Sequence, residues 1–535
     1  MRYLASAEEM RDIDRRAVMA GIPVSVLMEN AGRALSVEAL EMIAERCGGP
    51  VVVLAGPGQN GGDGLCAARH LSSRGLPVKV VLFASPRRMA AESRANLDAL
   101  RAYPVEVFHV TGGGTRFHEI RDGLGDAALI VDALLGTGQK GAPRPPMDEA
   151  VRWAGEAGVP IVACDVPTGV DSDTGRVFQP AVRADVTVTM GLPKRGLYVY
   201  PGRKYAGRIV VESLGLPPSL ISGPFPVSAV TLEDARRLIP RREADHHKGR
   251  SGHVLVIAGS ESMPGAAALA SKAALRAGAG TVTLACPREV YRVCAQMVPE
   301  VMVVAAADGG LFSVRDDQMA AIEGLLAKSR SAVIGPGLGR GESQEAFIDR
   351  CLALMTSTGT PCVIDADGLN GLSAIGGLSY LAGLEGKFIL TPHPGELSRL
   401  LGVDIQDIER DRLAAAREAA SRGKSVVCLK GAGTCVANSV GSITVNTTGD
   451  PAMATAGSGD VLSGVIAALI SQGLPLYEAA WLGVFWHGLS GEIAVRKAGS
   501  YGVLAGEVSD SLPRARRVIV GGERPGVRVN QEWPS

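Results

Sequence analysis

The feature that most constrains the fold is a repeated alternation of short β-branched runs with helical patterns. In the first half, the predicted strands cover residues 51–55, 78–83, 105–110, 128–132, 160–165, 185–190 and 208–212. Helical patterns at 65–74, 89–102 and 147–157 lie between several of them, and a longer one covers 8–47. Uninterrupted apolar strands that alternate with helices are typical of a parallel sheet covered on both faces. The sequence therefore predicts an α/β fold.

A second series of the same kind follows a stretch rich in proline and glycine. Its predicted strands cover 253–258, 281–285, 301–305, 332–335, 362–365, 388–391 and 426–429, followed by two antiparallel strands, 434–437 and 442–445, and a long helical end. At about 150 residues per domain, a chain of 535 residues has room for two large domains. We predict a first domain at 1–216, a linker at 217–224, a second domain at 225–518 and a polar tail at 519–535.

Composition narrows the function classes. Lysine plus arginine and aspartate plus glutamate both number 55, so a nonspecific nucleic-acid binder is not expected. The nine cysteines include no Cys-x-x-Cys pair, which fits a reducing cytoplasm better than a disulfide or zinc framework. The best apolar stretch, 461–470, is shorter than the ~20 residues of a membrane span. We expect a cytoplasmic protein with small-molecule ligands, no membrane and no nucleic-acid partner, assembled as a homo-oligomer.

Three strand ends in the first half carry polar side chains next to glycine-rich loops. The loop 56–64, Gly-Pro-Gly-Gln-Asn-Gly-Gly-Asp-Gly, follows a strand and opens a helix, where free backbone N–H groups favour phosphate. It matches a dinucleotide pattern, but the next strand ends Phe83-Ala84-Ser85, without the acid that holds an NAD ribose. Asp132 and Asp165 end two further strands, and the carboxyl ends of parallel strands share one edge. A crevice is the interpretation we favour over three helix caps or a plain tight turn.

These motifs, together with Leu-Met-Glu-Asn-Ala-Gly at 27–32, Gly-Thr-Gly at 136–138 and Val-Pro-Thr-Gly at 166–169, resemble the NAD(P)H-hydrate epimerase family over residues 1–215. The resemblance implies a Rossmann-like three-layer domain that holds K⁺ through Asn60, Asp132 and Thr168 and places Asp165 at the reacting ring. It implies a ligand lying along Gln59, Asn60, Gly61, Gly62, Asp63, Gly136, Thr137, Gly138, Gln139, Lys140, Gly141 and Ala142. Gln59 and Thr168 depart from the asparagine and serine common in that family, and both keep an oxygen ligand.

The implied chemistry needs a proton carrier. A hydrated dihydronicotinamide carries a hydroxyl on the carbon next to the ring nitrogen. That centre inverts by losing hydroxide to an iminium and regaining water, or by ring opening. Either route needs a positioned group that carries a proton, and the carboxylate of Asp165 is our candidate. Oxygen ligands suit K⁺ as a cation that shapes the loops, although this reasoning does not separate K⁺ from Na⁺.

In the second half, the string Ala-Gly-Ser-Gly-Asp-Val at 456–461 opens an apolar helix. Glycines at a helix start let backbone N–H groups reach a transferring phosphoryl group, and an adjacent aspartate can take a proton from the attacking hydroxyl. The alternative is an N-capped helix with a flexible approach. The string resembles the anion hole and catalytic base of the ribokinase-like superfamily, which implies that fold for the second domain and the role of base for Asp460.

Companion motifs narrow this resemblance. The segments His-Lys-Gly at 247–249, Gly-Pro-Gly-Leu-Gly at 335–339, Asp-Ala-Asp-Gly at 365–368, Thr-Pro-His-Pro-Gly-Glu at 391–396 and Lys-Gly-Ala-Gly-Thr at 430–434 resemble ADP-dependent NAD(P)H-hydrate dehydratases over about 225–518. The resemblance implies that ADP, with Mg²⁺, is held by Lys430, Gly431, Ala432, Gly433, Thr434 and Gly459. It also implies that the hydrate site is lined by Ala266, Gly337, His393 and Asp460.

The combined prediction is a bifunctional metabolite-repair enzyme. The first domain would interconvert the R and S forms of hydrated NADH or NADPH, and the second would use ADP to dehydrate the S form, giving NAD(P)H, AMP and phosphate. One alternative is a ribokinase-like kinase of a vitamin-type small molecule with an appended ligand-binding domain. A second is that the first domain binds without catalysing. The reaction products distinguish the repair enzyme from the kinase, since a kinase leaves a phosphorylated substrate whereas a dehydratase leaves free NAD(P)H.

Overall fold

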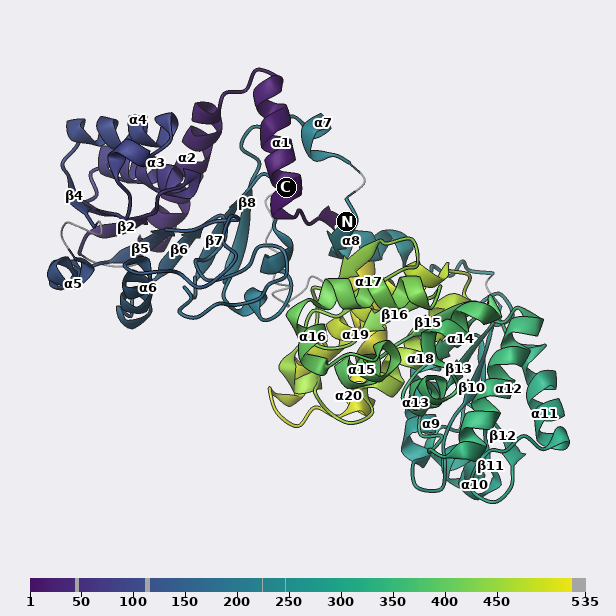
Figure 1. The fold of residues 1–535 in the computed structure, drawn as a ribbon. Helices are drawn as coiled ribbons and strands as arrows, with labels where there is room; N and C mark the ends of the chain where they lie inside the picture. The colour runs from purple at the N-terminus through teal and green to yellow at the C-terminus, as the bar shows by residue number, and fades with distance from the viewer. Residues whose placement is uncertain (44–47, 111–115, 224, 246, 522–535) are drawn as a thin grey trace. The chain divides into compact units, whose positions relative to one another are not determined.

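The computed structural model describes residues 1–43, 48–110, 116–223, 225–245 and 247–521. Contacts divide these residues into two compact units, with the division between Val227 and Ser228 and with Met1 and Arg2 grouped with the second unit. Figure 1 shows each unit as a sheet between helices. Among the described helices, none combines the length and apolar character needed to cross a membrane.

The first unit contains a seven-stranded sheet in which every strand pair is parallel. The strand order is β4-β3-β2-β5-β6-β7-β8. The strands are β2 (Val51–Ala55), β3 (Val78–Leu82), β4 (Val105–His109), β5 (Leu129–Ala133), β6 (Ile161–Cys164), β7 (Val186–Met190) and β8 (Arg208–Glu212). The helices are α1 (Ala7–Met19), α2 (Val24–Ile43), α3 (Gln59–Ser73), α4 (Ala91–Ala99), α5 (Phe117–Ile120), α6 (Met147–Glu156) and α7 (Pro218–Ile221).

The alternation of side chains along each strand gives this unit two separate cores. Val51 and Val53 of β2 pack on one face with residues of α1, α2 and α3. Val52 and Leu54 pack on the other face with residues of α5 and α6. Because successive strand residues point to opposite faces, an uninterrupted apolar strand such as β2 requires helices on both sides. This is the three-layer arrangement that the strand pattern predicts.

The second unit contains an eleven-stranded sheet, in the order β1-β9-β18-β17-β16-β15-β14-β13-β10-β11-β12. Pairing is parallel from β12 to β16, whereas β16, β17 and β18 pair antiparallel. Its strands are β1 (Arg2–Tyr3), β9 (Val227–Ala229), β10 (His253–Ile257), β11 (Thr281–Pro287), β12 (Met302–Ala307), β13 (Ser331–Ile334), β14 (Cys362–Ile364), β15 (Phe388–Leu390), β16 (Val426–Leu429), β17 (Cys435–Ala437) and β18 (Ile443–Val445).

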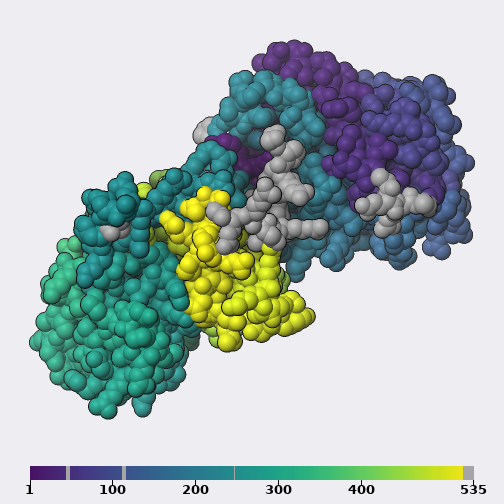
Figure 2. Space-filling model, turned by 180° about the vertical axis from the view of Figure 1, so that it is seen from behind, coloured from purple at the N-terminus to yellow at the C-terminus, as the bar shows by residue number. Residues whose placement is uncertain are grey.

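Thirteen helices accompany this sheet in the described chain: α8 (Leu232–Leu238), α9 (Pro264–Arg276), α10 (Arg288–Met297), α11 (Asp316–Leu326), α12 (Glu342–Thr358), α13 (Asp367–Ala374), α14 (Gly377–Leu384), α15 (Pro394–Leu401), α16 (Ile405–Arg410), α17 (Arg412–Arg422), α18 (Ser458–Ser471), α19 (Leu476–Ala498) and α20 (Ala505–Val520). Helix α18 is buried over most of its length, and it packs against α9 and α19. The carboxyl-terminal part of the chain, yellow in Figure 2, reaches the surface of this unit.

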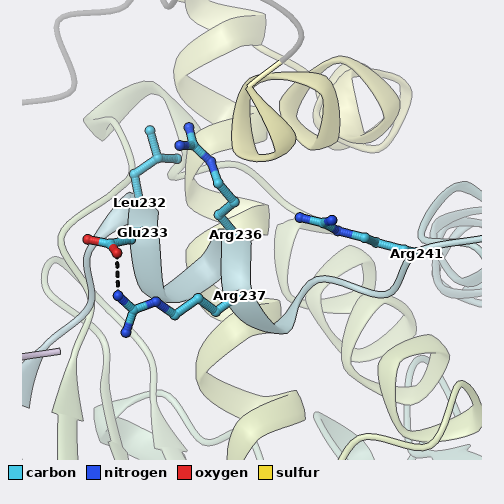
Figure 3. A pocket seen from close by; sticks show the side chains of 5 residues that line it. All are labelled: Leu232, Glu233, Arg236, Arg237 and Arg241. Carbon is cyan, nitrogen blue, oxygen red and sulfur yellow. Dashed lines mark hydrogen bonds and ion pairs between the residues drawn. The ribbon is translucent and has the colours of Figure 1, made fainter.

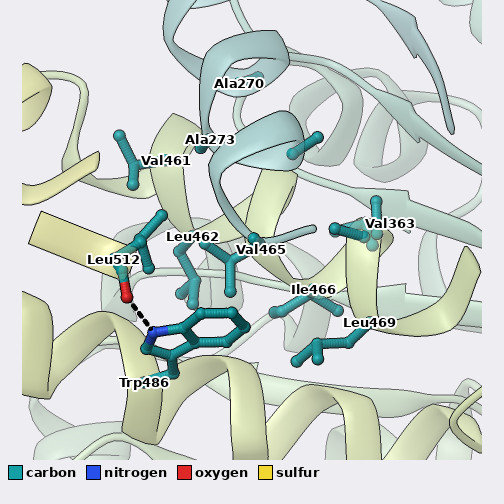
Figure 4. Close-up of a cluster of buried hydrophobic side chains, with 14 of the residues drawn as sticks. Ala270, Ala273, Val363, Val461, Leu462, Val465, Ile466, Leu469, Trp486 and Leu512 are labelled. Carbon is teal, nitrogen blue, oxygen red and sulfur yellow. Dashed lines mark hydrogen bonds between the residues drawn. The ribbon is translucent and has the colours of Figure 1, made fainter. Parts of the chain in front are cut away.

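The centre of the second unit is an apolar cluster built around Trp486. Its indole N–H donates to the carbonyl of Leu512 at 2.9 Å, and Leu462, Val465 and Ile466 of α18 lie beside the ring (Figure 4). A buried indole is tolerated in such a core when its one polar atom has a partner. The cluster fixes α18, and therefore also the position of the loop that opens this helix.

The predicted fold class, two α/β domains built on largely parallel sheets, is confirmed. The predicted helix at 8–47 is wrong in one respect, because it is two helices. Gly21, with φ of 91°, and Pro23 separate them, since a left-handed residue ends a helix and proline starts the next one. Residues 44–47 lie outside the described residues.

The predicted linker and the predicted tail both contain helical residues. The predicted linker contains the short helix α7, and the division between the units falls after it, at β9. The predicted tail begins inside α20, which continues to Val520, while residues 522–535 lie outside the described part of the chain.

Candidate active sites

The first candidate site lies where three neighbouring strands of the first unit end. Strands β2, β5 and β6 are adjacent in the sheet and parallel, so their carboxyl ends meet at one edge. Helix α3 begins at Gln59 directly after β2, Asp132 lies near the end of β5, and Asp165 follows β6. The crevice predicted from the strand ends therefore has its polar groups on one edge of the sheet.

A glycine allows the loops after β2 and β5 to approach each other closely. A Cβ atom on Gly56 would lie 1.8 Å from the carbonyl oxygen of Leu134, which no side chain could tolerate. At the same edge, a Cβ on Gly136 would lie 3.2 Å from Oδ1 of Asn60. The loop that begins after β5 therefore lies against the start of α3, as a ligand held between these two segments would require.

Thr168 and Asp132 form a buried oxygen cluster. Both are almost fully buried, and Asn60, at 9% exposed, is nearly so. The Thr168 hydroxyl donates to Asp132 Oδ1 at 2.8 Å, and the Thr168 backbone N–H donates to Oδ2 at 2.8 Å. The backbone N–H of Leu135 donates to the Thr168 hydroxyl at 3.1 Å. Of the three predicted cation ligands, the structure joins Asp132 and Thr168 directly.

The donors on Asp132 are all neutral. Burial raises its pKa to about 6, although hydrogen bonds from Thr168 and Leu134 lower it. The Nδ2 atom of Asn60 is buried without a partner among the described residues. The Asp132 carboxylate has no positive partner among the described residues, and the Thr168 hydroxyl oxygen lies against it, so oxygen ligands suited to a hard monovalent cation are present there. These observations fit K⁺.

The predicted ligand loop has one anchored residue and one exposed one. Gln139, 7% exposed, accepts a hydrogen bond from the backbone N–H of Gly169 at 2.9 Å and donates to the carbonyl of Gly141 at 2.8 Å. It thereby joins the loop after β5 to the loop after β6. Lys140 is largely exposed and pairs with Asp173 at 2.9 Å, a pair that raises the pKa of this lysine. Three predicted ligand residues of this loop remain: Thr137, Gly138 and Ala142. In the described structure, their side chains make no polar contact that bears on ligand binding.

Asp165 is paired with a lysine that the sequence reasoning missed. The side chain of Lys194, 1% exposed, donates to Asp165 Oδ1. The same oxygen accepts from the backbone N–H of Met190 at 3.0 Å and from the Thr189 hydroxyl at 3.2 Å. Asp165 itself has a left-handed backbone, with φ of 63°, which is uncommon outside glycine and typical of functional sites. The site therefore contains a carboxylate fixed in place by three donors.

Asp63, predicted as a ligand contact, lies beside this pair on the first turns of α3. Its Oδ2 atom accepts a weak hydrogen bond from the thiol of Cys164 at 3.8 Å. Burial raises the pKa of Asp63 well above that of an ordinary aspartate, and the charge of Asp165 raises it further. Two carboxyl groups in different environments at one strand edge are the arrangement expected of an acid–base site.

The second candidate site lies where α18 begins. Lys430 Nζ donates to Asp365 Oδ1 at 2.7 Å, and the Ser463 hydroxyl donates to Oδ2 of the same carboxylate at 2.5 Å. A Cβ on Gly459 would lie 3.2 Å from Lys430 Nζ and 3.6 Å from Asp365 Oδ2. The predicted nucleotide residues Lys430 and Gly459 are therefore brought together. Gly431, Ala432 and Gly433 form the turn that follows, and Thr434 closes it with a hydrogen bond to the Gly431 carbonyl at 3.0 Å.

Gly457 and Asp460 open α18 as the predicted anion hole requires. Gly457 has φ of 86°, a left-handed conformation that lets the chain turn into the helix without a side-chain clash. Asp460 is in the first turn, partly exposed. Burial raises its pKa to about 7, the charge of Asp365 also raises it, and Lys430 lowers it. A carboxyl group with a pKa near neutrality is well matched to general-base chemistry.

His393 and Glu396 are held by each other at the start of α15. His393 Nδ1 accepts hydrogen bonds from the backbone N–H groups of Gly395 and Glu396 at 3.0 and 3.3 Å. Glu396 accepts from the backbone N–H of His393 at 2.8 Å. Because Nδ1 is an acceptor, the neutral ring carries its proton on Nε2, and burial together with Lys430 lowers the pKa of His393. The Nε2 atom of this ring lies 3.5 Å from Glu396 Oε1.

The other two predicted hydrate residues, Ala266 and Gly337, adjoin each other. A Cβ on Gly337 would lie 3.1 Å from that of Ala266, so the start of α9 meets the glycine-rich loop after β13 there. His487 is 9% exposed, and its Nε2 atom lies 3.4 Å from the Ser458 hydroxyl oxygen. Burial lowers its pKa to about 4, so it is neutral beside the anion hole.

Sequence reasoning gave no role to Asp365 or Arg412 in this domain. Asp365 ends β14 and could have been found by the rule that identified Asp132 and Asp165. Arg412, 3% exposed, donates to the carbonyls of Lys430 at 2.9 Å and Leu429 at 3.3 Å. It begins α17, the helix that directly precedes β16 in the chain, and its contact with the end of that strand arises from folding and not from a local sequence pattern.

Two further places in the described chain, a cluster of possible metal ligands and a pocket, lack the features of these sites. Glu29, Cys66 and His70 lie close enough to share a metal ion, but the Arg69 guanidinium already pairs with Glu29 and lies 3.4 Å from the Cys66 sulfur. A pocket of about 450 Å³ on α8 is lined by Leu232, Glu233, Arg236, Arg237 and Arg241 (Figure 3). Glu233 pairs with Arg237 in this pocket. The residues of the pocket are distant in sequence from the strand ends that carry the aspartates of the two sites.

Comparisons with known proteins match each half of the chain separately. A family model described as YjeF-related protein N-terminus matches residues 24–196. A model described as NAD(P)H-hydrate dehydratase matches residues 254–514. Among solved structures, the chain resembles an ADP/ATP-dependent NAD(P)H-hydrate dehydratase from Bacillus subtilis, co-crystallised with ATP/Mg²⁺, at 31% identity and a TM-score of 0.46. The match covers 54% of this chain and 97% of that chain.

Relatives similar over the full length carry one name. A protein from Moorella thermoacetica is 40% identical over 522 residues, covering 96% of this chain and 97% of the relative. One from Coxiella burnetii is 36% identical, covering 97% of this chain and 100% of the relative. Both are named bifunctional NAD(P)H-hydrate repair enzyme. With both halves matched and the similarity extending over nearly the whole chain, this protein belongs to the family of bifunctional NAD(P)H-hydrate repair enzymes.

Proposed function

We propose that this chain repairs hydrated NADH and NADPH in two steps. The first domain, within residues 1–216, epimerises the R and S hydrates. The second, within 225–518, uses ADP to convert the S hydrate to NAD(P)H, with AMP and phosphate as the other products. The family to which the chain belongs supports both activities. The eight free, buried cysteines of the described chain support a reducing, cytoplasmic location.

The observation that carries this proposal is the position of Asp460. Its carboxyl group opens α18, next to a glycine whose backbone adjoins the Lys430 ammonium and the Asp365 carboxylate. A phosphoryl group held there would meet a cation and backbone N–H groups, while the attacking hydroxyl would meet a base. This supports phosphoryl transfer in the second domain. Phosphorylation converts a poor leaving group, hydroxide, into phosphate.

The second-domain reaction then has two parts. Asp460 takes the proton of the ring hydroxyl, and that oxygen attacks the β-phosphorus of ADP while AMP leaves. The ring nitrogen lone pair next expels phosphate from the adjacent carbon, and loss of a ring proton gives the dihydronicotinamide. Lys430 balances negative charge on the transferring group, and His393 offers a neutral Nε2–H to the hydrate.

Mg²⁺ fits this site through its carboxylates. Lys430 has three acids around it, Asp365, Glu396 and Asp460, so the positive charge is less than the negative. Glu396 Oε2 lies 3.8 Å from Lys430 Nζ, and burial raises the pKa of Glu396. Carboxylate oxygens are the ligands that Mg²⁺ prefers. Glu396 would hold the ion as it arrives on ADP, and the ion would neutralise charge on the phosphates.

In the first domain, Asn60, Asp132 and Thr168 would hold K⁺. The buried carboxylate of Asp132 and the Thr168 hydroxyl oxygen against it support this assignment. The ion would fix the loops after β2, β5 and β6 around the hydrate, while Asp165 and Asp63 face the reacting ring. Gln139 and the neighbouring loop residues would hold the rest of the ligand.

One assay tests the whole proposal. Mixed R and S hydrates are incubated with the full chain and either ADP or ATP, and dihydronicotinamide absorbance is followed to completion. Complete recovery of NAD(P)H requires both activities, because the dehydratase consumes one epimer. Recovery of only half the hydrate would support the proposed dehydratase activity and contradict the proposed epimerase activity. A phosphorylated hydrate that accumulates without NAD(P)H would favour the kinase alternative.

A further inference from the structure

We propose that Asp63 is the acid of the epimerase reaction and that Asp165, held in place by Lys194, is the base. This rests on the epimerase activity proposed for the first domain. The sequence alone makes Asp165 the single proton carrier and Asp63 merely a ligand contact. The contacts of the two carboxyl groups assign them different tasks.

Asp165 is held through one of its two carboxyl oxygens. Its Oδ1 atom accepts from the Lys194 ammonium, from the Met190 backbone N–H at 3.0 Å and from the Thr189 hydroxyl at 3.2 Å. Lys194 cannot move away easily, because it is 1% exposed and also donates to the Met190 carbonyl at 2.6 Å. All three donors contact Oδ1, so they leave the second oxygen of Asp165 to accept a proton.

Asp63 has the opposite surroundings. Its single side-chain hydrogen bond in the described structure comes from the Cys164 thiol, a weak donor, at 3.8 Å. No ammonium or guanidinium group of the described residues forms an ion pair with it. Because Cys164 immediately precedes Asp165, this contact also shows that the Asp63 carboxyl reaches across β5 to the end of β6.

The charged groups around Asp63 come from three other elements. They are Asp165 and the Cys164 thiol at the end of β6, Asp14 of α1, and Lys194 after β7. Burial raises the pKa of Asp63, both aspartates raise it further, and Lys194 and the Cys164 thiol lower it. Burial and Asp165 also raise the pKa of Asp14, although Lys194 lowers it. With one ammonium among three carboxyl groups, the pKa of Asp63 is raised, which favours its protonated form.

The two carboxyl groups, with one water molecule, complete an inversion. The C–O bond next to the ring nitrogen breaks, its electron pair leaves with the oxygen, and the proton of Asp63 makes that oxygen water. The nitrogen lone pair forms a C=N bond. A water then adds to the opposite face, the C=N electron pair returns to nitrogen, and the proton released by that water goes to Asp165. Transfer of this proton from Asp165 to Asp63 restores the enzyme.

The test compares Asp63→Asn with the wild-type full chain. Asparagine matches the shape of a protonated aspartate, so folding should be preserved, whereas the transferable proton is lost. We expect kcat for epimerisation to fall about 100- to 10,000-fold with little change in KM. Asp98→Asn, which alters an exposed carboxylate paired with Arg101, is the matched control and should keep wild-type rates.

An infrared measurement tests the proposal without turnover. The wild-type spectrum at pH 7, minus that of Asp63→Asn, should contain the carbonyl stretch of a protonated carboxylic acid. In Asp165→Asn, this band should titrate at a lower pH, because a neighbouring negative charge is gone. Absence of the band at pH 7, or epimerisation by Asp63→Asn within about 3-fold of the wild type, would overturn the assignment.

The two proposals fail in different ways. If the wild-type chain does not interconvert the hydrates at all, the epimerase function itself is wrong. If the wild type is active and Asp63→Asn is equally active, the function stands and the acid lies elsewhere. Asp14→Asn tests whether a neighbouring carboxyl group is the acid instead. This variant should shift the pH profile of kcat without the large fall in kcat expected of Asp63→Asn.

Discussion

Replacing Asp460 by asparagine should stabilise the second domain while abolishing its chemistry. Burial raises the pKa of this carboxyl group from 3.8 to about 7. The difference of roughly 3 units, at 1.36 kcal/mol per unit, gives an upper limit of about 4 kcal/mol by which the folded state disfavours the carboxylate. Because Asp460 is partly exposed, solvent screens the effect, and we expect a gain of about 1–2 kcal/mol.

The sign of this effect sets the pH window. Below pH 3.8 the group is protonated in both the folded and the unfolded chain, so it does not change the free energy of unfolding. As the pH rises from 3.8 to about 7, the unfolded chain releases its proton first, and stability contributed by this group is lost. Asparagine does not titrate. The variant should therefore match the wild type near pH 4 and exceed it in thermal midpoint at pH 8.

Activity should change in the opposite direction. If Asp460 is the general base, its loss lowers the rate about 100- to 10,000-fold. In the wild type, the rate should rise with pH around a midpoint near 7, because the base must be ionised to accept a proton. ADP affinity should change little, since Lys430 and the backbone around Gly459 are not altered.

The assay is single-turnover NAD(P)H formation from S hydrate and saturating ADP, with calorimetric melting at pH 4 and pH 8. Asp510→Asn, an exposed carboxylate on α20 paired with Lys272, is the control and should change neither quantity appreciably. A variant within about 3-fold of the wild-type rate would refute the base assignment. A variant that melts lower at pH 8 would show that the carboxylate is stabilised by its surroundings, contrary to the argument from burial.

Three further substitutions test other parts of the two sites. Asp132→Ala should lower epimerisation and remove its dependence on K⁺, because the charged ligand is lost, while dehydration of pure S hydrate measured in parallel is unchanged. Lys430→Met should weaken ADP binding in titration calorimetry by about 10- to 100-fold, the range for a lost hydrogen bond to a charged group. Gly56→Ala should destabilise the first domain by about 2–4 kcal/mol, because its Cβ meets the Leu134 carbonyl, and calorimetry should show no change in the other domain.

The sequence predicts the parts of these sites that depend on local order along the chain. Asp132 and Asp165 follow apolar strands, and the parallel arrangement inferred from strand–helix alternation places their ends together. The loop that opens α3 and the glycines that open α18 are also local patterns, since a helix start requires few residues. For the same reason, the fold class and most strand positions could be predicted from the amino-acid sequence alone.

The partners of these acids could not be predicted, because they come from distant residues. Lys194 lies 29 residues after Asp165, and Lys430 lies 65 residues after Asp365. Nothing in Pro-Lys-Arg at 193–195 distinguishes a buried ammonium from a solvated one. Arg412 likewise contacts the Lys430 carbonyl through three-dimensional packing alone. Sequence periodicity predicts which face a residue lies on, but not which charge on another element it meets.

Because of these lysine partners, the two unrelated sites share one electrostatic arrangement. In each, a lysine neutralises one strand-end carboxylate: Lys194 pairs with Asp165, and Lys430 pairs with Asp365. In each, a second carboxyl at the start of a helix has no such partner among the residues that the structure describes, and its pKa is raised by burial and by the paired carboxylate. The charge of the paired acid raises the pKa of its neighbour, which suits the unpaired acid to exchange a proton during the reaction. Asp63→Asn and Asp460→Asn should therefore share one signature, in which turnover in the affected domain falls while its stability above pH 7 rises. If either substitution lowered both, burial would not be the origin of its raised pKa.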